Sequence, residues 1–464
     1  MTTKLPPTPP GNYFLGHLPE YARDSLGYET RIAREYGDVV HMRWVNKHAY
    51  FISHPDDVQQ VLVTQADKFY KAPIYRELLS YFLGNGLLTS DGETWRRQRK
   101  LAQPAFHTRR IQAYADVMVA YTERLLTQWR PGATRDVNAD MMRLTLTVVA
   151  KTLFDADIDQ NAPRVGAALT DILEVTTKRM QSPIQVIPEW LPTPGNRRRQ
   201  AARRDLDEIV LGMINERRAA NADRGDLLSM LMQARDEAGH GMTDQQLRDE
   251  AVTIVLAGHE TTANALAWTW YLLAQHPEVE AQLHAELDHV LAGRLPTADD
   301  LRQLPYTEMV IKESMRLYPP IPSFARLALE DVTLSEYVVP RGMIVSLSPY
   351  VIHRDPRWYP EPEAFRPERM SRENEKLLPK GAYIPFSTGP RVCIGNNFAM
   401  LEAVLILATI AQRYRLRLVP GQTITPKAAL TLRPHPNIQM TLEPRGPASA
   451  PAATPQPAPA LAVA

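Results

Sequence analysis

Residues 243–275 constrain the fold more than any other part of the sequence. Thr243 opens the segment and Gln246 follows three residues later, which is the pattern of a helix N-terminal capping box, and Pro277 lies just past the end. At about 1.5 Å per residue, a helix over this segment is roughly 50 Å long and can cross a whole domain. Apolar residues recur on both of its sides, so the sequence predicts a long, buried helix.

The centre of this segment is polar and consists of Gly258, His259, Glu260, Thr261 and Thr262. These residues alone leave two interpretations open. A glycine and two threonines can simply kink a helix, because the hydroxyls bond back to carbonyl groups. Alternatively, a helix opened at Gly258 leaves a groove beside the Thr261 hydroxyl, where Glu260 relays protons. A buried carboxylate is rare unless it is paired or functional.

Helical periodicity dominates the rest of the chain, with strands in small groups. Further helical patterns cover residues 111–128, 144–154, 200–220 and 396–413. The stretches "DVVHMRWV" and "HAYFIS" predict a hairpin around Asn46 and Lys47, and "MIVSLSPYVI", "ALTLRP" and "NIQMTLEP" predict short strands. No linker divides residues 1–445, so we expect one large domain that is mainly α with a minor β part. Residues 446–464 are rich in Pro and Ala, which predicts a disordered tail or a linker.

Charge and the N-terminal sequence narrow the classes of partner. With 53 basic and 52 acidic residues, the chain has no bias toward nucleic acid or anionic membranes. The first residues contain neither the apolar core of a signal peptide nor a membrane anchor, so we expect a cytoplasmic protein without a membrane span. Their prolines indicate an extended lead-in that lies against the fold. Nothing in the sequence suggests more than a monomer.

The only cysteine, Cys393, lies in the stretch "FSTGPRVCIG", which a long apolar run follows at once. A single cysteine excludes an intramolecular disulfide and a metal site built from several cysteines. A lone cysteine is most often a small buried hydrophobe. This one instead lies among two glycines, a proline and an arginine, at the start of a predicted helix whose N–H groups lower the pKa of a thiol. We interpret the sulfur as a metal ligand.

A possible ion pair occurs in "KESMRLYPP". Glu313 and Arg316 are three residues apart and therefore neighbours on one helical face. An exposed pair of this kind is common and contributes little to stability. The apolar and proline-rich surroundings instead suggest burial, which requires further hydrogen-bonding partners. Arg369 in "FRPERM" is the candidate third member.

Together these stretches resemble the cytochrome P450 family of haem-thiolate monooxygenases, over about residues 5–445. The cysteine loop matches the family signature Phe-x-x-Gly-x-Arg-x-Cys-x-Gly, and the long helix carries the motif Ala/Gly-Gly-x-Asp/Glu-Thr. "KESMR" matches Glu-x-x-Arg and "WRRQR" matches Trp-x-x-x-Arg, whereas "FRPERM" departs from the companion Pro-Glu-Arg-Phe motif only at Met370. The five motifs occur in the family's order. The resemblance implies the P450 fold, a single domain shaped like a triangular prism, in a soluble, bacterial-type member.

The resemblance also implies roles for the matched residues. Haem b would be the cofactor, with Cys393 as the axial ligand of its iron, and O₂ the co-substrate. Thr261 would take part in activating O₂ and Glu260 in delivering protons, whereas Glu313, Arg316 and Arg369 would form a structural ion-pair network. The residues implied to contact haem are Trp95, Arg99, Ala257, Arg326, Phe386, Gly389, Arg391, Cys393 and Gly395. For Arg326 a plain surface role also remains open.

The reaction implied is insertion of one oxygen atom from O₂ into a C–H or C=C bond of a lipophilic substrate such as a fatty acid, terpenoid or steroid. Two electrons, ultimately from NAD(P)H, would come from a separate ferredoxin with its reductase or from a flavodoxin. The basic run Arg96, Arg97, Arg99 and Lys100 is a candidate docking site for that partner. The candidate pocket residues are Tyr75, Leu78, Leu79, Phe82, Leu87, Ala257, Ile321 and Phe324, with residues 180–195 as a lid.

Several alternatives stay open. Each candidate pocket residue can equally be ordinary core. Arg76 could hold a substrate carboxylate, and the run "NRRRQAARR" is either a site for anionic lipid or a solvated helix face. The enzyme could instead be a peroxide-driven haem-thiolate peroxygenase or peroxide isomerase, although the Glu260–Thr261 pair argues for O₂ activation. A non-catalytic haem-binding sensor is the other alternative.

Overall fold

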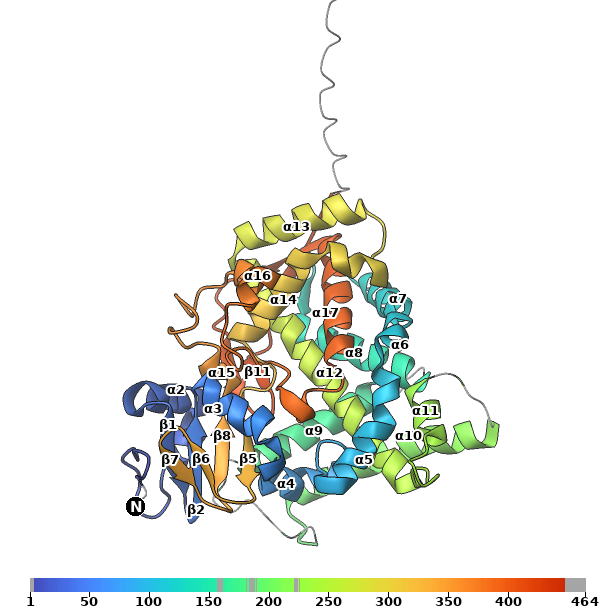
Figure 1. The fold of residues 1–464 in the computed structure, drawn as a ribbon. Helices are drawn as coiled ribbons and strands as arrows, with labels where there is room; N and C mark the ends of the chain where they lie inside the picture. Colours follow the sequence, from blue (N-terminus) through green and yellow to red (C-terminus); the bar gives the residue numbers. More distant parts are fainter. Residues whose placement is uncertain are drawn as a thin grey trace, which may run out of the picture.

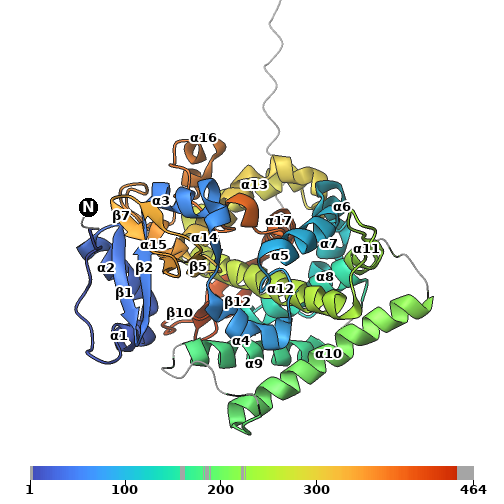
Figure 2. The ribbon, with the colours of Figure 1, turned by 60° about the horizontal axis from the view of Figure 1, so that its bottom comes forward.

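A computed structural model describes residues 4–156, 162–180, 182, 188, 190–220, 224 and 226–446. Within the lid expected at residues 180–195, residues 181, 183–187 and 189 lie outside the described residues, and so does the tail expected at 446–464 except for its first residue. Helix α12 (Asp244–Gln275) runs through the middle of the molecule, and other helices surround it (Figures 1 and 2). The outline in Figure 1 is triangular, with the largest sheet at one corner. The predicted mainly α fold with a minor β part is confirmed.

The α-helices account for most of the chain. They are α1 (Leu18–Arg23), α2 (Ser25–Tyr36), α3 (Pro55–Gln59), α4 (Pro73–Leu83), α5 (Gly92–Ala102), α6 (Thr108–Gln112), α7 (Ala115–Leu126), α8 (Val137–Phe154), α9 (Ala162–Met180), α10 (Pro194–Ala220), α11 (Leu227–Gln233), α12, α13 (Pro277–Leu291), α14 (Pro305–Leu317), α15 (Pro349–Ile352), α16 (Arg372–Glu375) and α17 (Asn396–Ala411). Short 3₁₀ and π turns complete the helical part, of which η1 (Gln60–Thr64), η5 (Pro367–Met370) and η6 (Gly389–Arg391) matter below.

The long helical predictions hold with shifted ends. The capping box at Thr243 and Gln246 is present in both directions, so α12 begins where the sequence indicated. The pattern over residues 111–128 is two helices, α6 and α7, because the chain breaks at Ala113 and Tyr114. Helix α8 begins earlier than predicted, since the Asp136 carboxylate caps it by accepting from the Ala139 N–H.

The strands form four small sheets. In the largest the order is β1-β2-β8-β5-β3, and the others are β4-β12-β9, β10-β11 and β6-β7. Their bounds are β1 (Val39–Trp44), β2 (Lys47–Ile52), β3 (Phe69–Lys71), β4 (Thr134–Asp136), β5 (Phe324–Ala328), β6 (Val332–Leu334), β7 (Tyr337–Val339), β8 (Ile344–Leu347), β9 (Tyr414–Leu418), β10 (Thr425–Ala428), β11 (Leu432–His435) and β12 (Gln439–Pro444).

The predicted N-terminal hairpin is confirmed, but its turn lies one residue earlier than expected. Trp44 pairs with Lys47, so the turn residues are Val45 and Asn46, and Val45 takes a φ of 58°. A β-branched residue rarely adopts a positive φ, which is why the sequence pattern placed the turn on Asn46 and Lys47. The second half of "MIVSLSPYVI" is helix α15 rather than strand.

The proline-rich lead-in lies against the sheet, as predicted. The backbone N–H of His41 donates to Pro7 O at 2.9 Å, and the His17 Nε2 atom lies 2.9 Å from Pro9 O. Among the described residues, no helix combines the length and the apolar character needed to span a bilayer.

Candidate functional site

The loop that carries Cys393 is fixed by backbone contacts on both sides. The Cys393 N–H donates to Phe386 O at 2.9 Å. Gly389 has a φ of 71°, and a Cβ there would lie 2.0 Å from Leu62 O of η1, so only glycine fits. At Gly395 the nearest protein atom to a Cβ would be 3.9 Å away, on Phe106, so contacts within the chain do not require that glycine.

The Cys393 side chain is exposed although it lies deep in the protein, so the thiol faces an internal space. Burial raises the pKa of this thiol, while the Gly395 N–H and the Arg99 charge act in the opposite direction. The backbone N–H at the helix start lowers the pKa of the thiol, as expected, but desolvation of the buried sulfur raises it by more. A metal ion at the sulfur would favour the thiolate.

Two predicted residues of helix α12, Ala257 and Thr261, are not fully buried. Ala257 is exposed in the middle of a helix that is otherwise mostly buried, and Thr261, one turn further on, is partly exposed. The helix is continuous at Gly258, so the predicted opening is wrong. A Cβ on Gly258 would lie 3.2 Å from Val149, and the glycine instead lets α8 pack closely. The Thr261 hydroxyl donates to Ala257 O at 2.7 Å and keeps its capacity to accept a hydrogen bond.

Glu260 is 1% exposed and is held by the β10–β11 hairpin. The Thr431 hydroxyl donates to its Oε1 atom at 2.5 Å, and Arg433 Nε donates to the same atom at 2.7 Å. The Oε2 atom is buried and has no hydrogen-bond partner among the described residues. The carboxylate is thus anchored through one oxygen, with the other free to take part in proton transfer. The Arg433 contact could not be predicted from the sequence, because Glu260 and Arg433 are far apart along the chain.

Three cations converge beside the cysteine loop, and we call Lys71, Arg326 and Arg391 the cation cluster. Arg326 is 8% exposed and donates only to Ala325 O, at 3.2 Å. Lys71 Nζ donates to two carbonyl groups, and Arg391 pairs with Asp91 at 2.6 Å. Among the described residues, Asp91 is the one carboxylate within ion-pair distance of the cluster.

Burial dominates the electrostatics of the cation cluster. It lowers the pKa of Lys71 to about 7, with Arg391 contributing, and that of Arg326 to about 10. The Nη1 atom of Arg391 is buried and has no acceptor among the described residues. The guanidinium of Arg391 lies 4.3 Å from the centre of the Trp95 ring. Sequence reasoning found Arg326, Arg391 and Trp95 but missed Lys71 and Asp91, which lie in no recognisable motif. The cluster sets one acid, Asp91, against two arginines and Lys71, whose lowered pKa leaves it only partly charged near pH 7, so a net positive charge remains.

Two further residues predicted to contact haem, Arg99 and Phe386, lie at the cysteine loop. Arg99 Nη1 donates to Val392 O at 2.8 Å, which braces the residue before Cys393 and leaves the cation cluster without Arg99. Phe386 is partly buried at the edge of the main core.

A polar pocket of about 280 Å³ adjoins the cation cluster. Tyr75, Lys71, Arg76 and Asp91 line it, together with residues of the turn that follows α4. Among the predicted pocket residues, Tyr75, Leu87, Ile321 and Phe324 are partly exposed. The prediction is wrong for Leu78, Leu79 and Phe82, which are at most 1% exposed and pack in the core, because α4 turns them away from open space.

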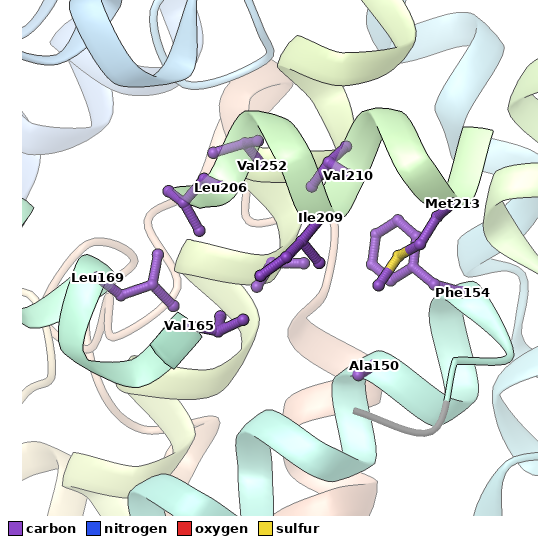
Figure 3. Close-up of a pocket in the computed structure, with 10 residues that line it drawn as sticks. Ala150, Phe154, Val165, Leu169, Leu206, Ile209, Val210, Met213 and Val252 are labelled. Carbon is purple, nitrogen blue, oxygen red and sulfur yellow. The ribbon is translucent and has the colours of Figure 1, made fainter. Parts of the chain in front are cut away.

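A separate apolar cavity of about 30 Å³ lies among α8, α9, α10 and α12 (Figure 3). Leu169, Ile209 and Met213 point into it, together with Val252 of α12. At about 100° of rotation per residue, Val252 lies on the side of α12 opposite Ala257 and Thr261. This cavity is therefore not part of the Cys393 site.

The third predicted group is fully assembled, and we call Glu313, Arg316 and Arg369 the Glu313 network. Glu313 and Arg316 are both 0% exposed and joined by two hydrogen bonds of 2.8 and 2.9 Å. Arg369 Nε lies 3.6 Å from Glu313 Oε1. The network ties α14 to η5.

The two basic runs are largely paired within the chain. Arg97 donates to Asp236 at 2.6 Å, and Lys100 pairs with Glu237. In "NRRRQAARR", Arg198 bonds Asp171, whereas Arg199 is 1% exposed with its guanidinium 4.6 Å from the Phe82 ring. Arg197, Arg198 and Arg204 are exposed, as the solvated-face interpretation expects, whereas Arg199 alone packs inward against α4.

These parts define a class of protein. One cysteine at an internal space, an alcohol on the facing helix and a cation cluster with excess charge suit a metal cofactor that carries carboxylate groups. The Cytochrome P450 family profile matches residues 6–442. The chain belongs to the cytochrome P450 family, whose members bind haem through a cysteine thiolate, and it is an oxidoreductase of the monooxygenase type.

Known relatives cover nearly the whole chain. Cyclooctatin synthase of Streptomyces melanosporofaciens is 40% identical over 94% of this chain and 95% of its own length. Cyclooctat-9-en-7-ol 5-monooxygenase of the same organism is 41% identical over 90% and 91%, and pentalenene oxygenase of Streptomyces avermitilis 34% over 93% and 96%. The solved structure of retinoic acid bound cyanobacterial CYP120A1 superposes with a TM-score of 0.86 at 26% identity, covering 96% of this chain and all of the other.

Proposed function

We propose that this enzyme inserts one oxygen atom from O₂ into a C–H or C=C bond of a lipophilic terpenoid, with electrons from a separate protein. The observations that support the proposal are the exposed thiol of Cys393 in its motif loop, the exposed Ala257 and partly exposed Thr261 on α12, and the cation cluster, in a chain that matches the cytochrome P450 family over residues 6–442. Haem b, when bound, supplies the redox chemistry that activates O₂.

The residues present fit haem b. Cys393 would hold its iron through the thiolate sulfur. Arg326 and Arg391 of the cation cluster would bind the propionates of haem b, because Asp91 pairs only with Arg391 and leaves the cluster with excess positive charge. Arg326 has unused donors that carboxylate oxygens can satisfy, and Gly395 leaves room for close approach at the cysteine loop. Arg99 braces the ligand loop through one Nη1–H group, and its remaining donors could also bind a propionate.

Thr261 and Glu260 serve the proton chemistry. The Thr261 hydroxyl, anchored on Ala257 O, is placed to accept and pass on a proton at the exposed face of α12. The Oε2 atom of Glu260, which has no partner among the described residues, is the candidate oxygen for proton transfer, while Arg433 and Thr431 hold its Oε1 atom. The pair is retained intact, which supports O₂ activation over a peroxide-driven reaction.

The terpenoid class rests on the relatives. Two of them are named for cyclooctat-9-en-7-ol and pentalenene, an unsaturated alcohol and an alkene by name. The pocket residues Tyr75, Leu87, Ile321 and Phe324 offer partly exposed apolar or aromatic surface for such a substrate. Arg76 is a less suitable contact, since neither name denotes an acid.

Electrons, ultimately from NAD(P)H, come from a ferredoxin with its reductase or from a flavodoxin that docks near the cysteine loop. Because Arg97 and Lys100 are paired with acids of the chain, the docking surface has less free charge than the basic run suggested. Charge reversal at Lys100 should therefore slow electron delivery at low salt by only a small factor, and a large factor would show that the Glu237 pair opens on docking.

The test combines spectra with turnover. The purified protein should be coloured, and its ferrous carbonyl complex should show the red-shifted band of sulfur ligation, which C393S should abolish. Optical titration with polycyclic alkenes and alcohols should reveal binders, and these should yield hydroxylated products with a surrogate ferredoxin system. Product formed with hydrogen peroxide but with no reductase system would favour a peroxygenase, and NADPH consumption without product across the panel would favour a sensor.

A further inference from the structure

The turn after α4, residues 84–87, is held against α12 by two consecutive acids. The Asn85 N–H donates to Asp249 Oδ2 at 2.8 Å, and the Leu87 N–H donates to Glu250 Oε2 at 3.1 Å. Asp249 is 4% exposed and Glu250 is 0% exposed, so both carboxyl groups lie inside the protein. Side-chain acceptors from another helix thus hold two backbone donors of one turn.

Two glycines of the turn are required by this contact. Gly84 has a φ of 53°, and a Cβ there would lie 2.0 Å from Asp249 Oδ2. A Cβ on Gly86 would lie 2.4 Å from the Thr253 hydroxyl and 2.8 Å from Asp249 O. Both glycines of "GNG" are therefore needed for the turn to contact α12. None of the P450 motifs named above accounts for them.

The other side of the turn is held by a cation. Lys71 Nζ donates to Leu87 O at 2.6 Å and to Ser90 O at 2.8 Å. The Leu87 residue is consequently fixed at its N–H by Glu250 and at its carbonyl by Lys71. Gln98 of α5 completes the support by donating to Asn85 O at 2.7 Å.

The position of the turn connects it to the candidate site. Glu250, Thr253, Ala257 and Thr261 follow one another at spacings of three and four residues and share one face of α12. Glu250 lies seven residues before Ala257, or roughly 10 Å along the helix axis. The polar pocket beside the cation cluster is lined by Asn85 and Thr89 of this segment, and Leu87 is partly exposed.

The carboxyl of Glu250 acts as a hydrogen-bond acceptor that need not be charged. Burial raises its pKa to about 7, with Asp249 adding to the rise and Leu87 N–H and Lys71 opposing it. A neutral acid accepts through its carbonyl oxygen, as a glutamine does. This predicts that a glutamine at 250 preserves the contact, whereas an alanine leaves the Leu87 N–H without a partner.

We propose that Asp249, Glu250 and Lys71 are positioning residues that hold residues 84–87 against α12, and so fix Leu87 as a specificity-determining wall of the substrate site. The proposal rests on the proposed function for the identity of that site. The ligand it concerns is the apolar body of the substrate. Asp249 and Glu250 act through the turn, so neither has to touch the substrate.

The experiment uses the haem-loaded enzyme and two azole probes. Imidazole is small, whereas phenylimidazole carries a ring that reaches beyond the iron toward the walls of the site. In D249A and E250A, amide hydrogen exchange at Asn85 and Leu87 should accelerate at least about tenfold, since each variant removes an acceptor from a buried donor. The dissociation constant for phenylimidazole should rise by a similar factor, and that for imidazole by less than about threefold.

The conservative and control variants separate positioning from general damage. E250Q should keep wild-type exchange and wild-type phenylimidazole affinity, because the glutamine retains the acceptor oxygen; D249N also neutralises the partner of the buried Arg248 and is therefore not a matched control. E402A removes another fully buried carboxyl group, on α17 and away from the turn, and should leave both readouts unchanged. If the alanine variants do not fold, G86A displaces the turn from Thr253 and from the Asp249 backbone carbonyl while keeping both acidic side chains, and it should reproduce their pattern.

Unaltered exchange in D249A, E250A and G86A would overturn the proposal, as would equal weakening of both azoles or failure of E250Q to preserve binding. Failure of the proposed function has a different signature. In that case the unsubstituted enzyme itself lacks the red-shifted carbonyl band or gives no azole-induced spectral change.

Discussion

Two buried arginines, Arg316 and Arg326, show opposite hydrogen-bonding states. Arg316 is 0% exposed, and its five N–H donors meet Glu313 twice and the carbonyl groups of His353, Pro362 and Ala364. Arg326 is 8% exposed and donates to one carbonyl, that of its own neighbour Ala325. The hydrogen-bonding capacity of the guanidinium is therefore fully used in Arg316 and only partly used in Arg326.

The difference separates a structural site from a binding site. A fully satisfied guanidinium needs nothing further, and its role ends with joining α14 to the segments around Pro362 and Ala364. An under-satisfied buried guanidinium carries a desolvation cost that a ligand with carboxylate groups can offset. Incomplete hydrogen bonding in the cation cluster is thus a better indicator of the cofactor than the presence of arginine alone.

The largest effect is expected at the Glu313 network. R316M leaves the Glu313 carboxylate buried without its partner, which costs about 3–5 kcal/mol of folding free energy. The variant should accumulate as unfolded or aggregated protein whether or not haem is supplied during expression. Urea unfolding followed by far-UV circular dichroism checks this, and a midpoint equal to that of the unsubstituted protein would remove the distinction between the two arginines.

A smaller and different effect is expected at Arg326. R326M should leave the haem-free protein as stable as before or slightly more so, because a poorly partnered charge leaves the interior. Haem should dissociate roughly 10- to 100-fold faster, which corresponds to a loss of about 1.5–3 kcal/mol from charge-assisted hydrogen bonds. Transfer of haem to an excess of apomyoglobin measures the rate. Equal rates in both proteins would mean that Arg326 is structural like Arg316.

Removing the charge of Asp91 should have the opposite effect on haem loss to removing the charge of Arg326. It is the carboxylate that pairs with Arg391, and it competes with any anionic group that the cation cluster binds. D91N keeps an acceptor oxygen but removes the charge, so haem loss should slow by about fivefold, or ~1 kcal/mol. The same transfer assay reports it, and faster loss in D91N would show that Asp91 organises the cluster instead of competing with the ligand.

Local signals were enough to predict α12, the Cys393 loop and the Glu313–Arg316 pair, because each is encoded within a few residues. A capping box, a glycine beside a cysteine and an i, i+3 spacing can all be read along the chain. Contacts between distant segments could not be predicted in this way. Lys71, the Glu260–Arg433 pair and the Asp249–Asn85 contact join residues that only the fold brings together. The core position of Leu78 and Phe82 likewise depends on which way α4 faces.

The last effect concerns Lys71 and appears only as a dependence on pH. Burial and Arg391 lower its pKa from the usual 10.5 to about 7, so between these values the unfolded chain binds more protons than the folded one. The free energy of unfolding of haem-free protein should therefore rise with pH from about 7 to 10.5, at no more than ~1.4 kcal/mol per pH unit from this group. Urea unfolding at several pH values measures the slope, and K71M should flatten it. Bound haem, by placing anionic groups near Lys71, should raise the pKa of that residue and weaken the same slope. If haem left the slope unchanged, the cation cluster would not bind the carboxylate groups of haem. Arg326 would then have no role in binding the cofactor.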